Sequence, residues 1–380
     1  MKRRGVKIAL FHHLKYRLTA CRTRMTEVQD LGVQAVCFLK MIKFDRLRFA
    51  SLWILLVLCI SCRLGAPKVR DASKAETSTA QPATTWQPDL PVYDHVVIIV
   101  EENKNYPQII GSPNAPYLND VLRKEGANLT RMFAEEHFSE GNYFWLFSGS
   151  NQHVGFLDRV PDASVDAENL GHELISSGRS FSGYSEGLPS IGSTTPSLGH
   201  YARKHVPWIS FSNTPQGTSF PSSNLRFEDF PTDFTKLPTV AFVIPNLIHD
   251  MHDGSPAVSV SSGDEWLRKH IDPYYQWAKQ HNGLLIITFD EDARVRYPGG
   301  LTDPASTTPR GQNRIPTLLA GAHIRNGDYE EGKGVNHVTL LRTLEAMYHL
   351  KRAGKQQELA QASGIKDDFV IMDVFDRAAQ

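Results

Sequence analysis

Cysteine is scarce in this sequence and confined to one end of it. The chain has 380 residues and four cysteines, and none lies beyond Cys62. Residues 63–380 therefore contain no disulfide and offer no thiolate to a metal ion. If this part of the chain works through a metal, the ligands must be oxygen atoms and imidazole nitrogens.

An excess charge of either sign is also lacking. Forty-one Lys and Arg residues balance 41 Asp and Glu residues, so the formal net charge at pH 7 is zero. Nothing points to bulk electrostatic attraction to nucleic acid, and we expect no such partner. A hydrophobic content of 41% and a charged content of 22% are typical of a soluble globular protein, and the length suffices for one large or two ordinary domains.

The apolar run at residues 49–58 is too short for a comfortable membrane span. Lys43, Arg46 and Arg48 precede it, and a basic stretch before a short apolar one is typical of a signal segment. Ser61 precedes Cys62 as at a bacterial lipoprotein cleavage site, so membrane attachment through a lipid on Cys62, an uncleaved N-terminal anchor and simple secretion all stay open. Each predicts export, to the periplasm, the outer surface or the medium, and residues 1–62 are interpreted as an N-terminal extension with this segment.

The stretch that follows has the composition of a tether. Residues 66–90 are rich in Pro, Ala, Ser, Thr and Gln, which cannot bury enough apolar surface to fold alone. We therefore interpret residues 63–92 as a flexible linker and residues 93–380 as the folded domain.

Apolar β-branched runs alternate with helical patterns in this domain. The runs at 96–100, 240–244 and 284–289, with a weaker one at 317–320, suit strands buried on both faces. Helical periodicity lies between and after them, at residues 115–125, 264–280 and 338–350. This alternation predicts an α/β fold with a mainly parallel central sheet flanked by helices. Residues 151–235 are expected to form a cap or an insertion over the site, with 184–186 and 201–205 as substrate contacts.

Polar side chains follow three of the predicted strands. Glu102 and Asn103 come after the first, PNLIHDMHDG (245–254) after the second, and Asp290 and Glu291 after the last. Ligands of open α/β sheets bind beyond the carboxyl ends of the strands, so these groups are expected at one edge. Crowded carboxylates repel one another, and a bound cation is the simplest way to neutralise them.

Each of these groups has a plainer interpretation that the residues alone do not exclude. The acids after a strand can form solvated turns or cap a helix. In the second cluster Asp250 and His252 are spaced to reach one ion, whereas His249 and Asp253 are either supporting groups or substrate contacts. His337, at the start of a helix, is more often structural in such a place. Ser139 is either a simple helix cap or a hydroxyl activated by the helix dipole.

Six stretches in order resemble the bacterial phosphoesterase family of acid phosphatases and phosphatidylcholine-type phospholipases C, within the alkaline-phosphatase-like superfamily. They are HVVIIVEENKNY, NYFWLFSGS, AFVIPNLIHDMHDG, GDEWL, LLIITFDEDA and HVTLLRTLE, and they span roughly residues 93–350. The resemblance implies an alkaline-phosphatase-like fold and a metal-dependent hydrolase of phosphate esters.

The resemblance also implies roles for individual residues. Ser139 resembles the nucleophile, which would form a phosphoserine, and Asn142 the asparagine that holds the phosphate. One or two divalent ions (Zn, Mn, Mg or Ca) would be bound. The first ion would be held by Glu102, Asn103, Asp290 and Glu291, and the second by Asp250, His252 and His337.

The sequence departs from the family beside the nucleophile. Family members usually carry prolines there, but this chain has Phe138 before Ser139 and Glu140-Gly141 after it. A negative charge at Glu140 would weaken phosphate binding if it faced the substrate. Two alternatives to a generic phosphatase or phosphodiesterase therefore stay open: a phospholipase C-type lipid hydrolase, and a non-catalytic metal-binding surface protein on the same scaffold.

Overall fold

The computed structural model describes residues 90–154, 160–161, 165–218, 221–293, 313–329, 334–354 and 369–376. The signal segment, Cys62 and all but the end of the proposed linker lie outside these ranges, so their interpretation stays a prediction. No helix among the described residues is long and apolar enough to cross a membrane.

An eight-stranded sheet forms the centre of the domain, in the order β11-β2-β10-β9-β1-β8-β4-β7. Two strand pairs, β12 with β3 and β5 with β6, lie outside it. The strands are β1 (His95–Glu101), β2 (Ala127–Leu129), β3 (Met132–Phe133), β4 (Phe181–Ser185), β5 (Ser197–Leu198), β6 (Tyr201–Ala202), β7 (Asn224–Arg226), β8 (Val240–Ile244), β9 (Gly283–Phe289), β10 (Thr317–Gly321), β11 (Gly327–Tyr329) and β12 (Val335–Asn336).

Five neighbouring strands, β9-β1-β8-β4-β7, run parallel, and β10 pairs antiparallel with both β9 and β2. Every residue of β8 and β9 is buried, and so is every residue of β1 after His95. Continuous apolar runs were the basis for predicting two-sided burial, and helices do cover both faces. The prediction of an α/β fold with a mainly parallel sheet is confirmed.

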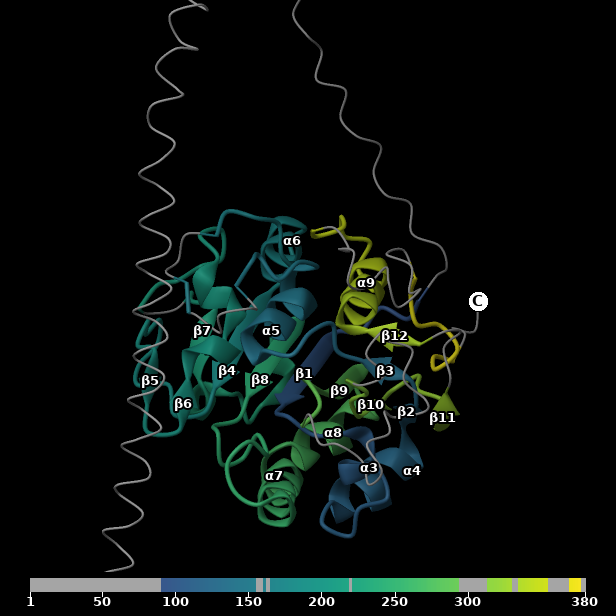
Figure 1. The fold of residues 1–380 in the computed structure, drawn as a ribbon. Coiled ribbons are helices and arrows are strands. Elements are labelled where there is room, and N and C mark those ends of the chain that lie inside the picture. The colour runs from purple at the N-terminus through teal and green to yellow at the C-terminus, as the bar shows by residue number, and fades with distance from the viewer. Residues whose placement is uncertain are drawn as a thin grey trace, which may run out of the picture. The chain divides into compact units, whose positions relative to one another are not determined.

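Figure 1 shows α5, α6 and α9 on one side of the sheet and α7 and α8 on the other. The helices are α3 (Tyr106–Ile109), α4 (Arg123–Glu125), α5 (Ser139–Ser148), α6 (Leu170–Ser176), α7 (Pro256–His270), α8 (Asp272–Ala278) and α9 (His337–Met347). η1 (Leu118–Leu122) is a short π-helix. The short 3-10 helices are η2 (Arg203–His205), η3 (Pro207–Ser210), η4 (Phe227–Asp229) and η5 (Phe234–Lys236).

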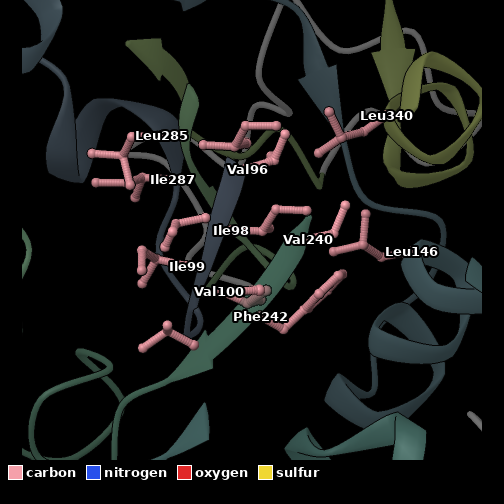
Figure 2. Close-up of a cluster of buried hydrophobic side chains, with 14 of the residues drawn as sticks. Val96, Ile98, Ile99, Val100, Leu146, Val240, Phe242, Leu285, Ile287 and Leu340 are labelled. Carbon is pink, nitrogen blue, oxygen red and sulfur yellow. The ribbon is translucent and has the colours of Figure 1, made fainter. Parts of the chain in front are cut away.

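The pleat of β1 sorts its side chains between these two helical layers. Val96 and Ile98 lie opposite Val240 and Phe242 of β8, and in Figure 2 this set adjoins Leu146 of α5 and Leu340 of α9. Figure 2 shows Ile99 on the other side, with Leu285 and Ile287 of β9. Because side chains alternate along a strand, the face of Val96, Ile98 and Val100 leads directly to Glu102.

Two parts of the fold differ from the expectation. Residues 151–235 are not only a cap, because β4 and β7 within them pair in register with the sheet. The helix predicted over 115–125 is a wide helical turn, η1, followed by the short α4. The pattern at 264–280 belongs to two helices: α7 begins earlier, at Pro256, and the chain restarts as α8 with Pro273 in its first turn.

Candidate active site

Ser139 begins helix α5 and faces a carboxylate instead of capping the helix. Phe138 stands at the cap position with extended backbone and provides no side-chain cap. The Ser139 hydroxyl donates a hydrogen bond of 3.0 Å to Glu102 Oε2, and it also hydrogen-bonds the carboxylate of Asp290. These partners come from the ends of β1 and β9, so the predicted convergence of distant residues occurs at this serine.

Glu102 is fully buried and held from several sides. Tyr143, one turn further along α5, donates its hydroxyl to Glu102 Oε1 at 2.6 Å. His205 Nε2 lies 3.3 Å from the same oxygen, and its ring stacks on Tyr143 with centroids 5.0 Å apart. Burial and then the charges of Asp290 and Asp250 raise the pKa of Glu102 well above its usual range.

Asn103 and Asp290 meet across the ends of the two adjacent strands. The backbone N–H of Asn103 donates to Asp290 Oδ1 at 2.9 Å, in a left-handed conformation (φ 44°) that asparagine tolerates well. The outer atom of the Asn103 amide also lies 3.3 Å from both carboxylate oxygens of Asp290. With the amide nitrogen at that position, Asn103 donates to the carboxylate of Asp290.

Glu291 and Asp292 continue the acidic stretch along the cleft. His137, two residues before the serine, lies 2.9 Å from Glu291 Oε2 through its Nδ1. Asp292 is tied down by Asn313, whose backbone N–H it accepts at 2.6 Å. Burial and then the charge of Glu291 raise the pKa of Asp290 to about 7, because the two neighbouring carboxylates repel each other.

The loop after β8 brings Asp250 against Glu102. Glu102 donates its backbone N–H to the carbonyl of Asp250 at 2.7 Å, and Asp250 Oδ1 accepts the backbone N–H of His252 at 2.8 Å. Among the described residues Asp250 Oδ2 has no hydrogen-bond donor, and His205 Nδ1 stands 3.7 Å away. His252 lines the cleft, and its Nδ1 lies 2.9 Å from Asp253 Oδ1. His249, by contrast, is paired with Glu186 at 2.8 Å.

His337 is close to the acids but has both ring nitrogens occupied. Nδ1 lies 2.7 Å from Glu135 Oε2, and Nε2 lies 2.8 Å from the carbonyl of Phe289. Burial alone would lower the pKa of His337, but the charge and hydrogen bond of Glu135, the carbonyl of Phe289 and the charge of Asp290 together raise it. A metal ion would have to displace one of these partners, so the geometry does not support His337 as a ligand.

Asn142 is likewise engaged by the backbone. Its side-chain N–H donates to the carbonyl of Glu136 at 2.7 Å, and its side-chain oxygen accepts the N–H of Glu136 at 3.1 Å. This pair of bonds closes the loop that leads into α5 and fixes Ser139 at its start. The amide nitrogen of Asn142 carries two hydrogens, and the bond to Glu136 uses one of them.

A cleft of about 430 Å³ opens over the serine. The residues that line it are an amide, a hydroxyl, two lysines, two carboxylates, a histidine and two apolar side chains: Asn103, Lys104, Phe138, Ser139, Lys204, His252, Glu291, Asp292 and Ala293. Glu140 is buried and is not among them, so its charge does not form the wall of the cleft. The sequence analysis did not single out Lys104, Tyr143 or His137, and it included Lys204 and His205 only within a stretch of substrate contacts.

Comparisons with known proteins identify the family of this chain. The Phosphoesterase family matches residues 114–351. A phosphatidylinositol-3-phosphatase from Mycobacterium tuberculosis is 44% identical over 266 residues, which cover 70% of this chain and 80% of that protein. A probable acid phosphatase from Kluyveromyces lactis is 24% identical over 306 residues, 76% of this chain and 66% of that protein. A crystal structure of an alkaline phosphatase superfamily protein from Vibrio parahaemolyticus matches with 14% identity and a TM-score of 0.49, covering 72% of this chain and 70% of that one.

These matches identify the class first: the protein is a hydrolase of phosphoric esters. More particularly, the chain belongs to the Phosphoesterase family. The resemblance drawn from six sequence stretches is thereby confirmed at the level of the family.

The donor set at the serine suits a hard divalent ion. Within the described ranges no three His, Cys, Asp or Glu side chains gather closely enough to hold an ion by themselves. Around Ser139, however, an amide and a hydroxyl join the carboxylates of Glu102 and Asp290. Carboxylate, amide and hydroxyl oxygens are the ligands that hard divalent ions prefer.

Proposed function

We propose that this protein is an exported, metal-dependent phosphomonoesterase that acts through a phosphoserine on Ser139. The observation that carries the proposal is the hydrogen bond from the Ser139 hydroxyl to Glu102 at the first turn of α5, in the wall of an open cleft. A hydroxyl at a helix N-terminus, beside a carboxylate, is placed to become a nucleophile.

One divalent ion would be held by Glu102, Asn103, Asp290 and Glu291 together with Ser139. It would lower the pKa of the bound hydroxyl and offset charge on the phosphate oxygens. Oxygen ligands of this kind favour Mg, Mn or Ca over Zn. The second set of expected ligands, Asp250, His252 and His337, is less suited to an ion. Both ring nitrogens of His337 are hydrogen-bonded, and Asp250 Oδ1 accepts the backbone N–H of His252.

The residues of the chain account for each proton and bond. Glu102 accepts the hydrogen bond of Ser139 and is therefore placed to take its proton as the serine oxygen bonds to phosphorus. The bond from phosphorus to the alcohol oxygen breaks, and the alcohol takes up the proton that Glu102 received from Ser139. Water then attacks the phosphoserine, the serine–phosphorus bond breaks, and the serine regains a proton from the attacking water. The N-terminus of α5 faces the phosphate throughout.

The substrate class is argued from the cleft and from the relatives. A volume of about 430 Å³ accommodates a phosphorylated headgroup, and one relative bears the name phosphatidylinositol-3-phosphatase. We infer a monoester, with a phosphorylated inositol lipid as the leading substrate. A phospholipase C activity would require a diester, so a panel of a chromogenic monoester, a chromogenic diester and inositol lipid vesicles separates these activities. Export rests on residues 41–62 alone, and cell fractionation tests it.

The deciding experiment is Ser139→Ala. Removing the nucleophile should lower kcat by about three orders of magnitude or more, while inorganic phosphate or vanadate still binds in the presence of the metal. Mass spectrometry of acid-quenched wild type should show a phosphate adduct on Ser139 that the variant lacks. Near-normal turnover by the variant would contradict the proposal. Absence of turnover in wild type on every ester, with the metal supplied, would instead support a non-catalytic metal-binding protein.

A further inference from the structure

Lys104 is a buried cation in the wall of the active-site cleft. It follows Glu102 and Asn103 at the end of β1, and only 5% of the residue is exposed. It lines the cleft together with Ser139 and His252. A lysine is almost never this buried without a set of partners that holds it.

Its partners occupy two of the three ammonium hydrogens. Nζ donates to the carbonyl of Met251 at 2.5 Å and to the carbonyl of Asn103 at 3.3 Å. An ammonium group has three donors and no acceptor. Among the described residues no acceptor takes the third, so one N–H remains for a molecule in the cleft.

The position of Lys104 also matters for charge. Burial has the largest effect on Lys104 and lowers its pKa, whereas the charges of four carboxylates raise it: Asp250, Glu102, Asp290 and Glu101. Among the described residues Asp250 Oδ2 and both carboxylate oxygens of Glu101 have no hydrogen-bond donor. A positive group in their midst offsets repulsion that would otherwise oppose the approach of an anionic phosphate.

The ammonium lies beside the group of residues from which a second metal ion was expected. Met251, which holds it, stands between Asp250 and His252 in the chain. His252 Nδ1 is bonded to Asp253, and both nitrogens of His337 are taken. Among the described residues that line the cleft, the lysines are Lys104 and Lys204, and Lys104 is the buried one.

We propose that Lys104 is a catalytic residue: its ammonium binds an oxygen of the phosphate ester in the cleft and supplies the positive charge that a second metal ion would otherwise supply. This inference rests on the proposed function, because it places the phosphate between Ser139 and Lys104. It predicts one tightly bound divalent ion per chain.

The test is Lys104→Met, which keeps the length of the side chain and removes its charge. With full metal, kcat should fall about 10²–10³-fold, as for loss of one preorganised donor to the transition state. Vanadate should bind more weakly, and metal content should remain one ion per chain in both proteins. Lys124→Met, which removes an exposed lysine paired with Asp120, is the matched control and should keep wild-type kcat. In Lys104→Ala, a small primary amine added to the assay should restore part of kcat.

A folding defect is separated from a catalytic one by a second variant. Lys104→Met/Glu101→Gln removes one buried carboxylate with the lysine, and it should fold and show the same loss of kcat. Normal kcat in either folded lysine variant overturns the inference while leaving the proposed function intact, and so do two tightly bound ions per chain in wild type. If wild type hydrolyses no phosphate ester and binds no vanadate, the proposed function fails instead.

Discussion

The surroundings of single ionisable side chains decide much of the behaviour expected from this protein. Glu173 of α6 is an example away from the cleft. It is buried, and among the described residues neither of its carboxylate oxygens has a hydrogen-bond donor. Burial and then the neighbouring Glu345 raise its pKa to about 9. The folded protein therefore holds a proton on Glu173 at neutral pH that the unfolded chain releases.

This makes the free energy of unfolding depend on pH with a definite sign. The ordinary pKa of a glutamate is about 4.3, so between roughly pH 4.5 and 9 the folded state binds more protons than the unfolded state. Stability contributed by Glu173 is greatest at the acidic end of this window and falls as pH rises through it. Glu173→Gln should match wild type near pH 4.5 and be more stable near pH 8 by about 1–3 kcal/mol.

Thermal unfolding across this pH range measures the effect. The matched control is Glu228→Gln, at an exposed position of η4, where the change should stay within about 0.5 kcal/mol at all pH values. Parallel curves for wild type and Glu173→Gln would contradict the assignment.

Among the elements, β4 depends on a close approach that only glycine allows. A Cβ placed on Gly183 would lie 2.0 Å from the ring of Trp208, a fully buried side chain of η3. The indole also donates its N–H to Asn224 Oδ1 of β7 at 3.1 Å, so it cannot swing away without losing this bond. The packing of one ring against the bare backbone of β4 thus connects η3 to the edge of the sheet.

We expect Gly183→Ala to lower the free energy of unfolding by about 1–3 kcal/mol or more, the usual cost of overpacking a core. Urea titration followed by tryptophan fluorescence would measure it. Ser182→Ala, the next position on the same strand and partly exposed, is the control and should change stability little. Equal midpoints for Gly183→Ala and wild type would show that Trp208 moves freely.

The sequence predicts a strand well when the residues of the strand itself determine its burial, and poorly when distant residues do. β1, β8 and β9 contain continuous apolar runs, so their residues alone indicate strands buried on both faces. β4 reads FSGYS, and its burial depends on Trp208 and on the neighbouring strands, which no local pattern reveals. In the site, the acids after strands were predictable because the sheet gathers strand ends. The partners of His337 were not, because Glu135 lies about 200 residues earlier in the chain.

For the molecule as a whole, the carboxylates around the serine are a source of instability that a divalent ion should relieve. Burial and then the charges of Asp290 and Asp250 raise the pKa of Glu102, and burial raises that of Asp250, so their shared charge opposes folding. An ion that binds only the folded state stabilises it by about 2.7 kcal/mol when present at 100 times its dissociation constant.

Chelation should accordingly lower the melting temperature of the whole domain, and the correct metal should restore it, whether or not a substrate is present. For a domain of this size each kcal/mol corresponds to about 2–4 °C. Asp290→Asn, which removes one ligand charge, should abolish most of the metal-dependent shift. Calorimetry with and without chelator makes the measurement, and an identical melting temperature in both conditions would argue against an ion at this site.

The two neighbouring acids at the end of β1 have a consequence for comparing this sequence with others. Glu101 and Glu102 are the same amino acid, yet Glu102 accepts the hydrogen bond of the serine, whereas both carboxylate oxygens of Glu101 are buried with no hydrogen-bond donor among the described residues. An alignment that slips by a single position here still matches glutamate to glutamate, but it transfers the chemistry to the wrong one. A misplaced gap within β1 therefore assigns the wrong glutamate to the active site.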